Sequence, residues 1–253
     1  MQNRDKWRPS KFVYGAGGLH ASRDTAELAL SSRLNAEVTA RHYDTYLRKY
    51  ARGRLLDLGC GKVPLFEAYR DRVSDNVCVD WGNSLHKNEH LDLECDLTQP
   101  LPFAAGEFDT ILLSDVLEHI AEPMSLWREM HRVLAADGTL ILNVPFFYWL
   151  HEQPDDYYRY TEFALRRFVH SSDMTVIELK PTGGVPEIMA DMIAKTSARV
   201  PFVGRAIAMA VQSLTLALVR TGIGSSLSAR TAGRFPLGYF LVAAKRPATM
   251  VLA

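Results

Sequence analysis

The stretch from Leu55 to Gly61 contains residue types that could bind a nucleotide. Three leucines and Asp57 end a short apolar run, and Gly59 and Gly61 then allow a sharp turn. Glycine adopts positive φ freely and places no Cβ in the way of a ligand. A second acid, Asp80, ends the next apolar run. A glycine turn followed after about 20 residues by a carboxylate is the arrangement that binds the ribose of a nucleotide.

Each residue of this pattern has a predicted contact with such a ligand. Asp57, Gly59, Cys60 and Gly61 form the turn around the cofactor. An ionised Asp80 can accept hydrogen bonds from both ribose hydroxyls, although an acid at this position can instead cap a helix.

Three later positions complete the predicted cofactor site. Trp81 either lies against the adenine or packs at the rim of the site. Asp96 is placed to accept a hydrogen bond from the adenine amine, with Leu97 covering the ring. Ser114 is expected at the carboxyl end of a central strand, beside the cofactor.

The segment from His151 to Thr161 is dense in histidine, acids, tyrosine and arginine. Loops at the carboxyl edge of a sheet carry function more often than packing. We predict His151 as the general base for a hydroxyl acceptor, which is a poor nucleophile at neutral pH. The predicted acceptor contacts are His119, Tyr157, Tyr158, Arg159 and Tyr160.

Two structural alternatives stand beside that prediction. His119 could bridge its own loop, and an ion pair between Arg159 and an aspartate could simply hold the 151–160 loop in place. No spacing of histidines, cysteines and carboxylates predicts a metal site.

The elements that must position these residues alternate between strand and helix patterns. An amphipathic helix is expected from about 24 to 50, after an irregular stretch over 1–20. Such alternation predicts a Rossmann-like α/β fold, with a doubly wound, mainly parallel sheet covered by helices on both faces. The predicted strands are 54–58, 76–80, 90–93, 108–113, 139–144, 174–180 and 238–244, and the later helices are 64–72, 122–135 and 161–170.

The last strand is separated from the others by a segment of different composition. We therefore divide the chain into an N-terminal part (1–50), a core (51–185 and 236–248) and a helical insertion (186–235). Ala206 to Val219 carries no charge but is shorter than the roughly 20 residues that span a bilayer. The insertion is either a helical cap or dimer surface, or an interfacial helix pair that lies on a membrane.

Composition limits the classes of function. The chain has 253 residues and a formal net charge of zero, which argues against a nucleic-acid partner. Its three cysteines, Cys60, Cys78 and Cys95, show no C-x-x-C spacing and are expected to be reduced thiols. No secretory signal is evident after Met1, so a cytoplasmic location is expected, including the inner face of a membrane.

The ordered series of motifs resembles the class I S-adenosylmethionine-dependent methyltransferases over roughly residues 50–180. The pieces that match are Leu55–Gly61, Val79–Asp80, Asp96–Leu97, Phe108–His119 and Leu134–Leu140. The resemblance implies a seven-stranded fold, S-adenosylmethionine as cofactor and methyl transfer as the reaction.

One departure from the family pattern points to a particular subset of the family. Val63 stands where the family usually has a third glycine. The resulting G-C-G-x-x-P turn resembles a subset that modifies sugars or cell-surface glycans. A dinucleotide site would instead require glycine at Pro64, so a nicotinamide cofactor is disfavoured.

The resulting prediction is a methyltransferase that acts by in-line transfer on a hydroxyl of a sugar, glycan or small molecule. The alternative is a non-catalytic scaffold that binds the nucleoside and docks a partner or a membrane through residues 186–235.

Overall fold

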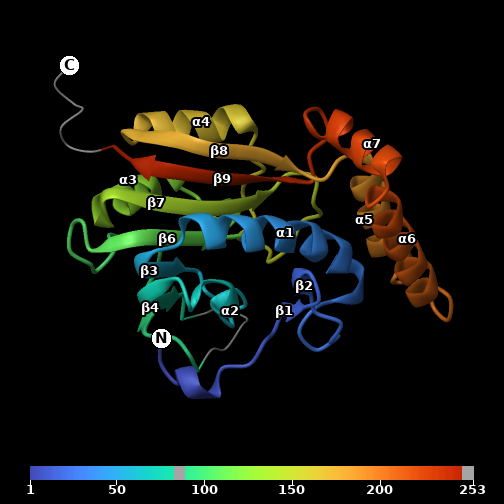
Figure 1. The fold of residues 1–253 in the computed structure, drawn as a ribbon, viewed down its shortest axis with the longest axis horizontal. Helices are drawn as coiled ribbons and strands as arrows, with labels where there is room; N and C mark the ends of the chain where they lie inside the picture. The colour runs from blue at the N-terminus through green and yellow to red at the C-terminus, as the bar shows by residue number, and fades with distance from the viewer. Residues whose placement is uncertain (83–88, 247–253) are drawn as a thin grey trace.

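The computed structural model describes residues 1–82 and 89–246, and its centre is a seven-stranded sheet (Figure 1). The strand order is β5-β4-β3-β6-β7-β9-β8, and only β9 runs antiparallel to its neighbours. The predicted doubly wound, mainly parallel sheet is therefore confirmed. The last two residues of the predicted core segment 236–248 lie outside the described residues. The strands are β3 (Gly53–Leu58), β4 (Val73–Asp80), β5 (Leu93–Glu94), β6 (Phe108–Ser114), β7 (Leu134–Pro145), β8 (Met174–Thr182) and β9 (Gly238–Lys245).

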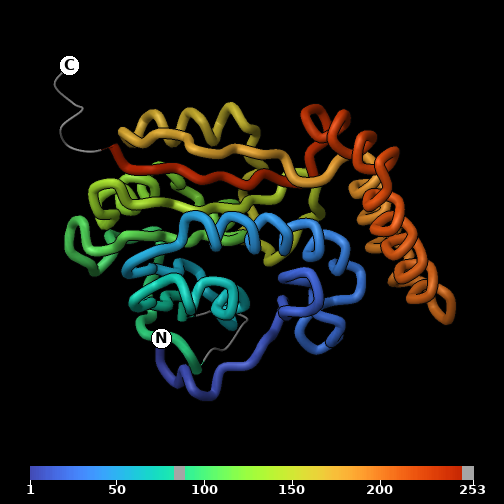
Figure 2. The backbone as a smooth tube through the Cα atoms, in the orientation of Figure 1, coloured from blue at the N-terminus to red at the C-terminus, as the bar shows by residue number. Residues whose placement is uncertain are grey.

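Helices cover both faces of the sheet, as Figures 1 and 2 show. One face packs on α1 (Arg33–Tyr50) and α2 (Phe66–Tyr69), and the other on α3 (Pro123–Val133) and α4 (Glu162–Ser171). Because side chains alternate along a strand, β3 supplies Leu55 to the first core and Leu56 and Leu58 to the second. The two cores hold the sheet rigid, so the loops at its edge are presented from a fixed frame.

Several boundaries differ from the sequence prediction. The stretch over 1–20 contains a hairpin, β1 (Phe12–Gly15) and β2 (Gly18–Ala21), preceded by the 3₁₀ turn η1 (Arg4–Lys6). The first long helix begins at Arg33, after the 3₁₀ turn η2 (Leu30–Ser32). The carboxylate of Asp24 accepts a hydrogen bond from the amide of Ala26 and thereby closes a local turn.

Two other elements are shorter than the sequence predicted. The predicted strand 90–93 is the two-residue β5, and the predicted helix 64–72 is the single turn of α2. Both lie on the β4 side of the sheet, where the strand-to-strand connections are short and irregular. Tertiary pairing, rather than local propensity, decides their length.

Three helices separate β8 from β9 and project beyond the sheet (Figure 1). They are α5 (Val185–Ser197), α6 (Gly204–Val219) and α7 (Gly222–Ala232). Within the described residues no single helix is long and apolar enough to cross a bilayer. The pair α6 and α7, bent by 96°, meets that criterion jointly by length and composition.

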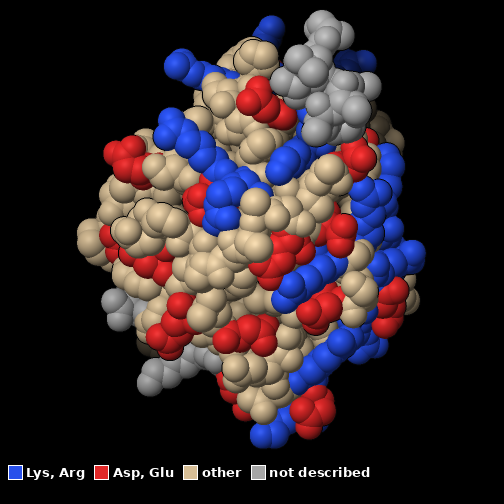
Figure 3. Space-filling view, turned by 90° about the vertical axis from the view of Figure 1, so that its left-hand side faces the viewer, with Lys and Arg blue, Asp and Glu red and all other residues tan. Residues whose placement is uncertain are grey.

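The opposite end of the molecule, where β6 and β7 begin, has an ordinary polar surface. In Figure 3 lysine and arginine side chains alternate with aspartate and glutamate over this face. Such a mixture is typical of a surface in contact with water.

Candidate functional site

The three aspartates of the predicted cofactor site follow three neighbouring strands. Asp57 and Asp80 lie at the ends of β3 and β4, which pair Leu58 with Val79. Asp96 follows β5, where Glu94 pairs with Asp80. The topology therefore brings all three residues to the carboxyl edge of the sheet, where α/β folds bind ligands.

Asp80 faces the glycine turn directly. Its Oδ2 accepts a hydrogen bond of 2.8 Å from the amide of Gly61, and its Oδ1 accepts one of 2.7 Å from the amide of Trp81. A Cβ built on Gly61 would meet nothing within 4 Å, so the backbone of this turn borders open space. The Trp81 ring is 47% exposed beside it. A carboxylate, an open backbone turn and an exposed aromatic ring are the groups that a nucleoside requires.

The glycine turn is held by close packing. Gly59 has φ of 69°, and a Cβ there would lie 2.4 Å from Cγ2 of Val116. Val63 has φ of 50° and is fully buried, so a β-branched residue is held in the left-handed region. The Trp7 indole donates a hydrogen bond of 3.1 Å to the Val63 carbonyl. The N-terminal segment thus holds Val63 in a conformation that glycine adopts more easily.

Asp57 lies beneath this turn rather than facing the open space. It is 3% exposed, and its Oδ2 accepts a hydrogen bond of 3.2 Å from the Tyr69 hydroxyl. Burial raises the pKa of Asp57 to about 7, against the opposing effect of the Tyr69 hydrogen bond, and Asp80 adds to the rise. Cys60 is also buried, and its contact with Cys78 together with burial raises the pKa of its thiol. Both residues support the turn from below.

The remaining predicted cofactor residues lie at this edge but have other partners. Oδ1 of Asp96 accepts hydrogen bonds from the amide and hydroxyl of Thr98, at 2.9 and 2.7 Å, and so caps a local turn. Leu97 is buried in the core. The Ser114 hydroxyl forms a hydrogen bond with the Tyr43 hydroxyl of α1.

A polar cluster next to Ser114 did not emerge from the sequence. Asp115 has φ of 54°, and its carboxylate accepts hydrogen bonds of 2.5 Å from Asn143 and 3.0 Å from Lys11. Asn143 interrupts the apolar run of β7 from Leu140 to Val144, and this interruption is a sequence signal for the cluster. Lys11 comes from the N-terminal segment, so only the fold could place it here.

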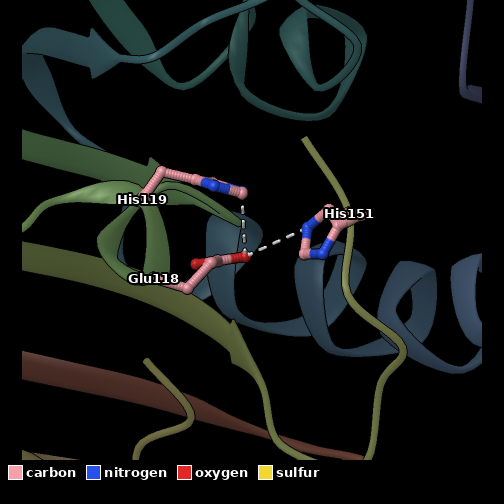
Figure 4. Close-up of side chains that lie close together, drawn as sticks. All are labelled: Glu118, His119 and His151. Carbon is pink, nitrogen blue, oxygen red and sulfur yellow. Dashed lines mark ion pairs between the residues drawn. The ribbon is translucent and has the colours of Figure 1, made fainter. Parts of the chain in front are cut away.

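A second cluster joins Glu118, His119 and His151 (Figure 4). Nε2 of His119 and Nε2 of His151 each lie 3.8 Å from Oε1 of Glu118. Glu118 is fully buried, and within the described residues neither of its carboxylate oxygens accepts a hydrogen bond. Burial, followed by the charge of Asp115, raises the pKa of Glu118 well above its ordinary value. The sequence analysis had assigned no role to Glu118 and had predicted no metal-binding group.

His151 is held from its other side by a fixed carboxylate. Its Nδ1 lies 3.3 Å from Oδ2 of Asp156, and its backbone amide donates to the same oxygen at 2.9 Å. Burial, followed by the charge of His119, lowers the pKa of His151, so its neutral form is favoured. Arg159 donates hydrogen bonds of 2.6 and 2.8 Å to the two oxygens of Asp156. Burial opposes ionisation of Asp156, but these Arg159 hydrogen bonds hold its pKa at about 2.

The other predicted acceptor contacts are distributed differently. Tyr157 and Tyr158 are half exposed, and their hydroxyls donate to Asp155 and to the carbonyl of Ala121. Tyr160 is a correction: it is 4% exposed, lies in the core and donates to the Leu117 carbonyl, so its ring does not reach a ligand. Arg159 pairs with Asp156, which is the kind of ion pair that the structural alternative predicted for this loop.

A cavity of about 590 Å³ adjoins this cluster. The Tyr148 ring borders the cavity and packs on His151, with the ring centroids 5.1 Å apart. Lys195 lies over the same Tyr148 ring and pairs with the buried Asp191. The lining residues are Phe147, Tyr148, Trp149, Asp191, Met192, Lys195, Thr196 and Arg199.

Comparison with known sequences gives a family for the part of the chain that forms this edge. Residues 56–142 match the family described as Methyltransferase domain. The ubiquinone biosynthesis O-methyltransferase of Psychrobacter arcticus is 31% identical over 119 residues, which are 42% of this chain and 46% of that protein. The match therefore spans less than half of the length of that relative.

Solved structures share the fold over a larger part of the chain. The [4+2]-cyclase SpnF superposes with a TM-score of 0.54 at 17% identity, over 84% of this chain and 82% of that one. A chain of the Haloferax volcanii complex with the Trm112 methyltransferase activator gives 0.54 at 19% identity, over 87% and 95%. At such identities the likeness concerns the fold alone, and a cyclase shares it.

Proposed function

We propose that this protein, which carries a domain of the class I S-adenosylmethionine-dependent methyltransferases in residues 56–142, methylates a hydroxyl oxygen of a small-molecule acceptor. The observation that carries the proposal is the pairing of the Asp80 carboxylate with the open Gly61 turn, beside the histidine cluster at the same sheet edge.

The residues at this edge fit the cofactor. We assign the ribose hydroxyls to Asp80 and the adenine to Trp81, with Gly59 and Gly61 leaving room for the backbone to approach. We keep Asp96 and Leu97, which follow β5, as the proposed adenine contacts, and Ser114, at the end of β6, as a proposed cofactor contact; Asp96 would have to exchange its bonds to Thr98, and Leu97 would contact the ring from the core. Asp57 and Cys60 support the turn from beneath.

In this reaction the protein contributes mainly by orienting the acceptor relative to the methyl group. When bound, S-adenosylmethionine supplies an electrophilic methyl group on a sulfonium whose charge disappears on transfer. Holding the acceptor in line with that methyl can contribute about 7–11 kcal/mol to lowering the barrier. We assign the general base, a role worth about 10²–10⁴-fold, to His151, whose lowered pKa favours the neutral ring and which packs on Tyr148 at the wall of the cavity.

The cavity beside His151 is the proposed acceptor site. Its aromatic lining suits either an aromatic ring or the apolar face of a sugar, and Lys195 and Arg199 add positive charge. The curated relatives are named as ubiquinone biosynthesis O-methyltransferases, which favours an aromatic hydroxyl. The sugar or glycan class rests on the G-C-G-x-x-P turn alone.

Cofactor binding is tested by calorimetry with S-adenosylhomocysteine. Asp80→Ala removes charged hydrogen bonds and is expected to weaken binding by about 100-fold or more. Asp80→Asn, which keeps one acceptor oxygen for the turn, controls for folding, and Asp71→Ala changes an exposed acid elsewhere. Equal affinity in all three variants would refute the cofactor assignment.

The reaction is tested by transfer of labelled methyl groups to a panel of aromatic and sugar hydroxyls. Turnover that falls about 100-fold or more in His151→Ala is the expected result. Intact cofactor binding with no turnover on any acceptor would instead support the non-catalytic scaffold.

We further propose that α5–α7 contact an anionic membrane surface. Residues 192–237 contain five arginines, one lysine and no acidic residue, unlike the mixed surface in Figure 3. Large apolar side chains are exposed on the same helices and their connections. They are Met189, Met192, Val200, Phe202, Val203, Ile207, Met209, Leu214, Leu218, Ile223 and Leu227. Exposed apolar residues flanked by cations are typical of helices at a lipid interface.

Vesicle flotation tests this surface. The wild type is expected to float with vesicles of phosphatidylcholine and phosphatidylserine, and less so with phosphatidylcholine alone. A Phe202→Ser/Ile223→Ser variant should lose flotation, whereas Phe163→Ser, at a position that is also strongly exposed but lies on α4, should not. Unchanged flotation of the double variant would exclude the proposal. The proposal would also be excluded if the protein formed a dimer in solution and the same two substitutions made it monomeric.

A further inference from the structure

We propose that Glu118, His119 and His151 bind a divalent transition-metal ion. The three side chains come from two separate segments and converge on one point (Figure 4). Their ligand atoms all lie within 4.8 Å of one another. Two imidazoles and one carboxylate are the donor set of many catalytic metal sites with open positions.

The hydrogen bonding of His119 directs a lone pair at Glu118. Its Nδ1 lies 2.8 Å from the carbonyl oxygen of Asp155, and a carbonyl can only accept. Nδ1 therefore carries the hydrogen, and in the neutral ring Nε2 holds a lone pair. That lone pair faces Oε1 of Glu118 at 3.8 Å. Two acceptors that face each other in a buried site repel unless a proton or a metal ion lies between them.

Nε2 of His151 faces the same oxygen, but within the described residues Nδ1 of His151 makes no hydrogen bond. Its Nδ1 lies toward the carboxylate of Asp156, and its Nε2 lies 3.8 Å from Oε1 of Glu118. A carboxylate behind a histidine is the usual outer partner of a metal ligand, because it fixes the ring and makes the other nitrogen a better donor. Asp156 is itself fixed by two hydrogen bonds from Arg159.

The spacing is too long for hydrogen bonds and suits an intervening ion. Donor and acceptor atoms in a hydrogen bond lie about 2.7–3.2 Å apart, well below the 3.8 Å measured here. Two atoms that bind one ion at about 2.1 Å each are separated by roughly 3–4 Å. Glu118 also offers two buried oxygens that lack a hydrogen-bond donor among the described residues. A charge buried in this way is costly unless it is paired or ligates a metal.

The chemistry of the site selects the class of ion. Imidazole suits zinc, cobalt, iron and nickel, whereas magnesium and calcium prefer sites made only of oxygen. The carboxylate of the exposed Glu152, 4.0 Å from Nε2 of His119, can approach as a further ligand. On the other side of the site the Tyr148 ring, which borders the cavity, packs against His151.

This ion would have a role in the proposed reaction, and that part of the inference rests on the proposed function. An acceptor hydroxyl bound to the ion loses its proton to water more readily, because a bound metal lowers the pKa of a coordinated oxygen. The oxygen lone pair then forms the O–C bond while the C–S bond breaks and its electrons pass to sulfur. One proton is released for each methyl group transferred. With the ion bound, His151 would be a ligand, and this role would replace the general-base role assigned to it above.

Metal binding is measured directly, without cofactor or acceptor. Chelator-stripped protein is titrated with Co²⁺ and Zn²⁺ by calorimetry, and the visible spectrum of the Co²⁺ form reports nitrogen ligation. We expect one ion per chain. His119→Ala and His151→Ala should each weaken binding by about 100-fold or more, and Asp156→Asn by about 10- to 100-fold. His170→Ala, on the surface of α4, should bind as the wild type does.

The Glu118→Gln variant tests whether Glu118 is a metal ligand or has only a structural role. Glutamine has the size and the neutral charge of a protonated Glu118, so the metal-free variant should keep the melting temperature of the wild type while the Co²⁺ spectrum is abolished. Affinity for S-adenosylhomocysteine should stay unchanged in every ligand variant, so failure of this inference is distinguishable from failure of the cofactor assignment. No saturable Co²⁺ or Zn²⁺ binding by the wild type would overturn the proposal. Binding that survives in a His119→Ala/His151→Ala variant would overturn it as well.

Discussion

At the scale of single residues, the acids at the sheet edge have different roles although their sequence contexts look alike. Asp80 borders open space and holds the glycine turn through two backbone amides. Asp57 is buried beneath that turn, and Asp96 caps a loop. Glu118 is the most deeply buried and lacks hydrogen-bond donors within the described chain. The environment of each carboxylate, rather than its distance from a glycine, decides its chemistry.

Asp57 should make the stability of the protein depend on pH. Because its pKa is raised to about 7 in the folded state, folding favours the protonated form. The resulting penalty is absent below the unfolded pKa near 3.8, grows as pH rises and is complete above pH 7. A shift of this size corresponds to about 4 kcal/mol in full.

Asp57→Asn mimics the protonated side chain and should remove this dependence. We expect its stability advantage over the wild type, measured by urea unfolding, to grow by about 2–3 kcal/mol between pH 5 and pH 8. Asp71→Asn, at an exposed carboxylate, serves as the control. An advantage of Asp57→Asn that is the same at both pH values would contradict the assignment.

At the scale of elements, one buried polar side chain links the inserted helices to the start of the first long helix by hydrogen bonds. Gln212 of α6 accepts a hydrogen bond of 2.8 Å from the amide of Leu34 and donates one of 2.9 Å to the carbonyl of Leu30. Both partners lie at the start of α1. In the sequence, Gln212 is only a polar residue in the apolar segment that forms α6. In the fold it supplies hydrogen-bond partners to backbone groups near the start of the first long helix, which would otherwise be buried without partners.

Gln212→Ala should therefore destabilise the protein by about 1–3 kcal/mol, since it leaves a buried donor and a buried acceptor unsatisfied. Gln212→Glu, which keeps the acceptor but loses the donor, should fall between the wild type and the alanine variant near neutral pH. Ser213→Ala, at the exposed neighbouring position, should have little effect. Thermal unfolding of the wild type and the three variants gives their order of stability. Equal melting temperatures would show that α6 is held by packing alone.

At the scale of the whole molecule, the two ends of the sheet are different surfaces. The end where β6 and β7 begin carries charges of both signs (Figure 3). The other end gathers the glycine turn, the histidine cluster and the projecting helices (Figure 1). If α5–α7 lie on a membrane, the cavity between α5 and the 147–149 loop is close to that membrane, which suits an acceptor with an apolar part.

Local patterns were sufficient to predict the sheet and its glycine turn. Apolar strands, turn residues and helix signals act over a few residues, and parallel β–α alternation leaves little choice of topology. The same logic placed Asp80 and His151 at the correct edge. It misjudged the N-terminal hairpin and Tyr160, since long-range packing decided both.

By itself, then, the sequence determined the fold class and brought the predicted site residues to one edge of the sheet, because both follow from short-range pattern and chain order. Only the tertiary structure decided which side chains meet there. Lys11 reaches Asp115 across the fold, and His151 reaches Glu118 and His119 from a different loop. These contacts depend on loop paths and side-chain burial, which follow from the packing of the whole chain and leave no periodic trace in the sequence.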